Sequence, residues 1–144
     1  MSADPRPVNP VVVLDASAAL RAVLDSAAQT ALIDRIAAAD LVLAPTLLRA
    51  EVGNALWKYR RSGLLDLAQA VERHAEAMTL VHRLVDDADL FPEALALAVD
   101  FDHPAYDTLY LVTARRHAAA ILSFDHRLHA AAERARIAAE RFGG

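Results

Sequence analysis

The stretch VVVLDAS, residues 11–17, decides the fold class of this chain. Its first four residues form an apolar run of strand length, and Asp15 follows them directly, where it can cap a helix beginning near Ala16. A continuous apolar run is typical of a strand buried on both faces, as in a parallel sheet covered by helices. The stretch therefore predicts a β-strand that leads straight into a helix, with an acid at the junction.

The rest of the chain repeats this alternation of short strands and helices. Further apolar runs of strand length lie at 41–43, 79–81 and 120–122. Helical patterns lie at 16–24, 28–39, 46–62, 67–77, 90–101, 105–117 and 126–134. Such alternation predicts an α/β sandwich with a short, mainly parallel sheet. Ligands gather at the carboxyl ends of the strands in such folds, so polar residues after a strand are the first candidates for chemistry.

Length and composition favour a single domain. The chain has 144 residues, of which 56% are hydrophobic, and it has no cysteine. We expect a loose leader at 1–10, which holds three prolines, and one domain over 11–144. The lack of cysteine excludes disulfide scaffolds, thiolate metal sites and cysteine nucleophiles. No apolar run is long enough for a membrane span, and a cytoplasmic protein is expected.

The charge balance limits the kinds of partner. Fifteen basic residues against 19 acidic ones give a net charge of −4, which argues against a broad basic surface for nucleic acid. Acids spread over the surface would mean only solubility. Several carboxylates converging on one pocket would instead suit a divalent cation.

Four acids occupy positions that suit a shared site, although each has an ordinary explanation. Asp15 and Asp125 both end an apolar run and precede a helix, and a parallel sheet would bring them to one edge; the ordinary explanation is helix capping. Asp107 falls in the first turn of a helix, where an acid suits the helix dipole. Glu51 lies at the margin of the apolar stripe of helix 46–62, half turned toward the interior, where a solvated glutamate is the commoner case.

These acids lie in four blocks that together resemble PIN-domain ribonucleases, and specifically the toxins of VapBC-type toxin–antitoxin pairs. The blocks are VVLDASA (12–18), EVGNAL (51–56), YDTLYL (106–111) and LSFDHRL (122–128). Their order and spacing match the family from about residue 11 to the end of the chain. One departure is Ser123, where the family more often has threonine, and either hydroxyl can hydrogen-bond the site.

The resemblance implies a Mg²⁺- or Mn²⁺-dependent endoribonuclease that hydrolyses RNA phosphodiester bonds. Asp15, Glu51 and Asp107 would be metal ligands, and Asp125 a ligand or a residue that orients water. Ser17, Asn54 and Ser123 would support these acids. The cation would activate water and polarise the phosphodiester, so no protein nucleophile is required.

The resemblance also implies partners. A homodimer and a cognate VapB-type antitoxin are expected, with the antitoxin's C-terminal segment obstructing the acidic site. An apolar groove formed by the early helices and the 46–77 hairpin could receive that segment.

Two other interpretations stay open. An aspartate-based phosphotransfer or phosphatase enzyme also places an aspartate after its first strand, although Ser17 stands where a second acid would be expected. The other is a PIN-like binding module without catalysis. Lys58, Arg115 and Arg116 are candidates for holding substrate phosphates, or else part of a solvated surface.

Overall fold

A computed structural model describes residues 8–25 and 27–142 of the chain. Its centre is a five-stranded sheet in the order β3-β2-β1-β4-β5, in which every neighbouring pair is parallel. The strands are β1 (Val11–Leu14), β2 (Leu41–Pro45), β3 (Arg83–Val85), β4 (Ala120–Leu122) and β5 (Ala139–Glu140). The α/β class and the parallel sheet predicted from the sequence are confirmed.

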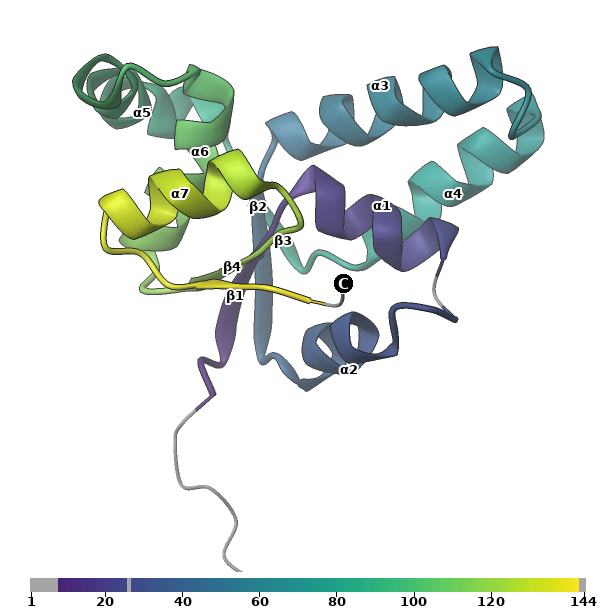
Figure 1. Cartoon of the computed structure of the whole chain (residues 1–144), viewed down its shortest axis with the longest axis horizontal. Helices are drawn as coiled ribbons and strands as arrows, with labels where there is room; N and C mark the ends of the chain where they lie inside the picture. The colour runs from purple at the N-terminus through teal and green to yellow at the C-terminus, as the bar shows by residue number, and fades with distance from the viewer. Residues whose placement is uncertain (1–7, 26, 143–144) are drawn as a thin grey trace, which may run out of the picture.

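Helices cover both faces of this sheet. They are α1 (Ala16–Leu24), α2 (Thr30–Ala38), α3 (Leu47–Arg61), α4 (Leu67–Thr79), α5 (Asp87–Phe101), α6 (Ala105–Arg116) and α7 (His126–Arg134). Helices α1 to α4 lie on one side of the sheet and α5 to α7 on the other, and α3 and α4 form a long hairpin that extends from the body (Figure 1). In the part of the chain that the structure describes, no helix is long and apolar enough to cross a membrane.

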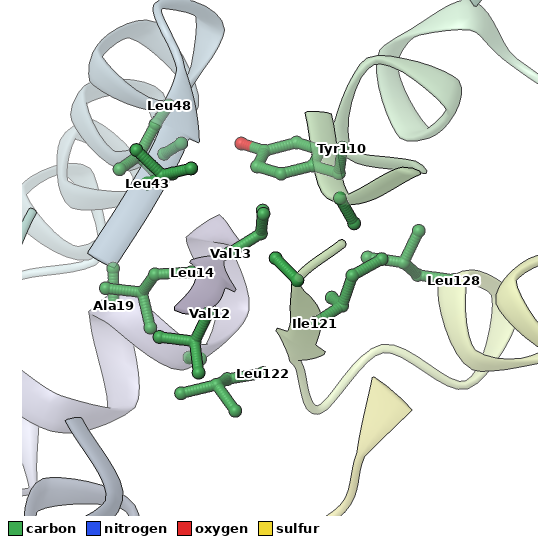
Figure 2. Close-up of a cluster of buried hydrophobic side chains, with 14 of the residues drawn as sticks. Val12, Val13, Leu14, Ala19, Leu43, Leu48, Tyr110, Ile121, Leu122 and Leu128 are labelled. Carbon is green, nitrogen blue, oxygen red and sulfur yellow. The ribbon is translucent and has the colours of Figure 1, made fainter. Parts of the chain in front are cut away.

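The core lies where the strands meet both helical layers. Val12, Val13 and Leu14 are fully buried, and Figure 2 shows them between side chains from β2, β4 and the helices. Burial of a strand on both faces explains its continuous apolar run, because neither face of β1 meets water.

One predicted strand is wrong. The apolar run at 79–81 is not a strand, because α4 continues to Thr79 and the chain turns through the following residues. The strand is β3, which pairs Arg83 with Leu43 of β2. Leu80 and Val81 are apolar because they pack against the core, and a short apolar run cannot by itself distinguish this role from a strand.

Two further differences concern the ends of the chain. Strand β5 was not predicted, since its two residues carry no periodic signal. Most of the expected leader, residues 1–7, lies outside the described residues. Within its last part, Asn9 donates a hydrogen bond from Nδ2 to the Ala118 carbonyl at 2.9 Å and accepts one from the Val11 amide.

The register of the sheet positions the candidate site. Strand β1 lies between β2 and β4, with Leu14 opposite Leu122. The residues after these two strands therefore stand side by side, and the Asp15 amide donates to the Leu122 carbonyl at 3.3 Å. Strand β2 ends at Pro45 and leads into α3, which carries Glu51.

Candidate active site

Asp15 is the most enclosed of the four candidate acids, with 5% of its surface exposed. It caps α1 through a hydrogen bond from the Ala18 amide to its Oδ1 at 2.9 Å. The same oxygen accepts from the Ser17 hydroxyl at 2.8 Å, and Oδ2 accepts from the Ser123 hydroxyl at 2.5 Å. The carboxylate is thus held from both sides, so capping is only part of its role.

The two serines also fix the loop that follows β4. The Ser17 hydroxyl accepts from the Phe124 amide at 2.9 Å, and the Ser123 hydroxyl accepts from the Asp125 amide at 2.9 Å. Each serine therefore joins Asp15 to this loop. Both serines are predicted from the sequence as supporting residues, and both contact the first acid.

Burial raises the pKa of the Asp15 carboxyl from its ordinary value of 3.8 to about 6. Its three hydrogen bonds act in the opposite direction, and the negative charge of Asp125 adds to the increase. A buried carboxylate is costly to ionise unless a positive charge compensates it. The site therefore favours either a proton or a cation beside Asp15.

Glu51 connects the four acids electrostatically. It is half-buried on α3, and burial is the main cause of its raised pKa, with smaller increases from the charges of Asp107, Asp15 and Asp125. All three other acids are therefore close enough to influence it. The charges of four acids from separate parts of the chain therefore act on one another near the carboxyl edge of the sheet.

Tyr110 holds Glu51 in place. Its hydroxyl donates to Glu51 Oε1 at 2.6 Å, and its buried ring spans from α6 toward α3, with the oxygen directed to the side of Leu43 and Leu48 (Figure 2). Burial and the charge of Glu51 raise the pKa of Tyr110 well above its ordinary value of 10.0, so this hydroxyl remains a donor.

The other two acids have partners of their own. Asp107, in the first turn of α6, contacts His103: its Oδ2 lies 2.7 Å from His103 Nε2. Asp125 caps α7 by accepting from the Arg127 amide at 2.9 Å. Both side chains are partly exposed, in contrast to Asp15.

Sequence reasoning missed Tyr110 and His103. Tyr110 lies three residues after Asp107, a spacing that places two side chains on neighbouring positions of one helix face, so this signal was available. Its contact with Glu51, 59 residues away in the chain, was not readable from any local pattern.

Some candidates are not drawn into the site. Asn54 and Lys58 are exposed on α3, and neither makes a side-chain hydrogen bond among the residues described. Arg115 and Arg116 both bind Glu93, at 2.6 Å and 3.1 Å, and they lie at the opposite end of α6 from Asp107. These two arginines are engaged in a surface ion-pair cluster.

The acids converge without forming a ready-made coordination shell. Within 8–25 and 27–142, no three acidic or histidine side chains stand close enough to bind one ion as they are placed. Glu51 is held by Tyr110 and Asp107 by His103, so direct ligation would need side-chain adjustment or bridging water. The donor set itself, carboxylate oxygens without cysteine, is that of a hard divalent cation.

If this edge binds a divalent cation, as the family resemblance implies, Tyr110→Phe should weaken Mn²⁺ binding roughly tenfold, the usual effect of losing a residue that orients a ligand. Removing the hydroxyl also removes the hydrogen bond that lowers the pKa of Glu51, so this pKa should rise further. Titration with Mn²⁺ near neutral pH measures the affinity, and ¹³C NMR of the glutamate carboxyl measures the pKa. Tyr59→Phe, on the exposed side of α3, is the control. Equal Mn²⁺ affinity in both variants would show that Tyr110 is only a core residue.

Comparison with known proteins places this geometry in a family. Residues 12–134 match the model of the PIN domain, which spans all four acids. No curated protein matches the chain.

Several solved structures share the fold. PAE2754 from Pyrobaculum aerophilum is 26% identical with a TM-score of 0.68, over 83% of this chain and 78% of that one. VapBC2 from Rickettsia felis, bound to a DNA fragment from its promoter, is 10% identical with a TM-score of 0.68, over 92% and 99% of the two chains. The sarcin–ricin-loop-cleaving toxin VapC20 of Mycobacterium tuberculosis is 21% identical with a TM-score of 0.62, over 83% and 94%. With the family model covering most of its length, the chain belongs to the PIN-domain family.

Proposed function

We propose that this chain is a Mg²⁺- or Mn²⁺-dependent endoribonuclease and the toxin of a type II toxin–antitoxin pair, acting in the cytoplasm. The observation that carries the proposal is the convergence of Asp15, Glu51, Asp107 and Asp125, with the other three acids each raising the pKa of Glu51. Carboxylates that repel one another at a sheet edge are stabilised by a cation.

The residues present fit a divalent cation by their chemistry. Asp15, Glu51 and Asp107 would bind it directly, and Asp125 would bind it or orient water. When bound, such an ion lowers the pKa of a coordinated water and polarises a phosphodiester. The raised pKa values of Asp15 and Glu51 support this assignment, because they mark a place where negative charge lacks compensation.

The chain's own side chains supply orientation. Ser17 and Ser123 direct the two oxygens of Asp15, and Tyr110 fixes one oxygen of Glu51. His103 fixes one oxygen of Asp107. Such partners keep ligands in place during hydrolysis and limit the rearrangement that the reaction requires.

Two exposed apolar surfaces support the proposed partners. Helices α3 and α4 enclose a groove of about 320 Å³ lined by Gly53, Leu56, Trp57, Arg60, Leu67, Ala70, Val71 and His74. This groove, on the hairpin, suits the apolar face of an antitoxin segment. On α5, Phe91, Leu95 and Val99 are exposed at spacings of one helical turn, which suits a second copy of the chain.

RNA cleavage tests the proposal. The purified chain should cut one or a few members of a panel of structured RNAs in Mg²⁺ or Mn²⁺, leaving a 5′-phosphate, and EDTA should abolish cutting. Adding the small protein encoded beside this chain should inhibit the reaction. Metal-independent cleavage, or none with any RNA, would count against the nuclease; unaffected cleavage in the presence of the small protein would count against the toxin assignment.

A further inference from the structure

A pocket next to Asp15 and Asp125 has a chemistry opposite to that of these acids. It encloses about 160 Å³ and is lined by Arg21, Ser123, Phe124, His126, His129, Arg141 and Phe142. Its charged and titratable lining residues are two arginines and two histidines, and no acid lines it. The chain as a whole is acidic, with a net charge of −4, so a cavity lined by basic side chains differs from the average character of the molecule.

Three separate parts of the chain build this pocket. Arg21 comes from the last turn of α1, and Arg141 and Phe142 follow β5. The remaining residues come from the loop after β4 and from the first turns of α7. Figure 1 shows the yellow C-terminal segment ending beside α1, which is how these distant parts meet.

The pocket holds a guanidinium against an aromatic surface. Arg21 Cζ lies 4.5 Å from the centre of the Phe124 ring, and the Phe124 and Phe142 rings are 6.1 Å apart. A guanidinium stacked on a ring is held flat, with its N–H groups directed outward for bidentate binding of phosphate. Among the described residues, neither Arg21 nor Arg141 forms a salt bridge with a carboxylate. Their charges are therefore available to an anion.

The pocket shares a wall with the candidate active site. Ser123 lines the pocket, and its hydroxyl donates to Asp15 and accepts from the Asp125 amide. Phe124, whose ring faces Arg21, donates its amide hydrogen to Ser17. An RNA strand with one phosphodiester at the acidic site would therefore place a neighbouring nucleotide at the pocket.

We propose that this pocket binds the phosphate and base of a nucleotide adjoining the scissile bond of single-stranded RNA, an inference that rests on the proposed function. Arg21, stacked on Phe124, and Arg141 bind the phosphate, and the Phe142 ring offers the base an aromatic surface. Stacking of this kind accepts any base. A second phosphate contact explains how an acidic protein holds RNA beside four carboxylates.

The test measures binding of a fluorescein-labelled, single-stranded oligouridylate to the full chain in EDTA, so that no cleavage occurs. Arg21→Gln and Arg141→Gln should each weaken binding by about tenfold, the effect expected for one charge-assisted hydrogen bond. The slope of log affinity against log salt should fall by about 0.7 for each phosphate that the variant no longer neutralises. Arg61→Gln is the matched control, because Arg61 lies at the same 4.5 Å over a ring, that of Trp57, outside the pocket.

A second readout locates the ligand. Uridine 5′-monophosphate should shift the amide NMR signals of Phe124 and His126 in the wild-type chain, and much less in Arg141→Gln, which is near the end of the chain and leaves the helices unaltered. Wild-type affinity in both arginine variants would overturn the proposal. An equal loss of affinity in the Arg61→Gln control would also overturn it. A glutamate-rich peptide that displaces the RNA and shifts the Phe124 and His126 amide signals would overturn it too, because the pocket would then bind an acidic peptide.

These outcomes separate the pocket from the proposed nuclease. Binding that depends on Arg21 and Arg141 without any metal-dependent cleavage would refute the nuclease and leave the pocket only as a site for a nucleotide of single-stranded RNA. Metal-dependent cleavage with unchanged binding in both variants would refute the pocket alone.

Discussion

Replacing Asp15 by asparagine is expected to reduce metal-dependent RNA cleavage by about a thousandfold or more. Asparagine preserves the size of the side chain and can still accept from the Ala18 amide and the Ser17 hydroxyl, so the cap of α1 should survive. It removes the negative charge that would bind the cation, and with it the activation of water. Initial rates of cleavage of the best RNA substrate, measured in Mn²⁺, give the ratio.

Two controls make this result interpretable. Asp100→Asn removes an equivalent charge from the exposed surface of α5 and should leave cleavage unchanged. Circular dichroism should show that Asp15→Asn retains the fold. If the Asp15 variant cleaves RNA as fast as the Asp100 variant, the proposed role of the acid cluster is refuted.

The strand that leads to Asp15 was predictable because its burial determines which residues it contains. Val12 and Val13 are buried on both faces of the sheet, and this burial leaves a continuous apolar run in the sequence. Asp15 was found because it ends such a run. Its register against β4 brings Ser123 to it. The sequence implied a role for Ser123 only through the family resemblance, because the order of the strands in the sheet could not be read from the chain.

The long-range parts were not predictable in the same way. The contact of Tyr110 with Glu51 depends on how α6 packs against α3, and the pocket depends on where the chain end returns to α1. Neither of these contacts produces a periodic pattern of residues that could be recognised in the sequence. The misplaced third strand has the same cause, because Leu80 and Val81 are apolar through tertiary burial in a turn.

The free energy of unfolding should also depend strongly on pH. A carboxylate usually makes a protein more stable as pH rises, whereas Asp15 should make this one less stable. The pKa of Asp15 is about 6 in the folded chain, above the ordinary value of 3.8. Between these two values the folded chain binds more protons than the unfolded chain, so its stability falls as pH rises from about 4 to above 6. The loss of stability attributable to Asp15 is about 3 kcal/mol in the metal-free protein, and the raised pKa of Glu51 adds in the same direction.

A bound cation should reverse this loss, because it takes the place of the proton on the ionised carboxylates. We expect Mn²⁺ to raise the free energy of unfolding near pH 7.5 and to have little effect near pH 5, where protons compete with the metal. In EDTA, Asp15→Asn should be more stable than the wild type near pH 7.5, and the difference should vanish near pH 4. Urea unfolding at pH 4, 5 and 7.5 measures both the effect of Mn²⁺ and the difference between the variant and the wild type. A wild type whose stability in EDTA exceeds that of Asp15→Asn near pH 7.5 would mean that the ionised Asp15 is already compensated within the chain, and the argument for a cation at this edge would lose its electrostatic basis.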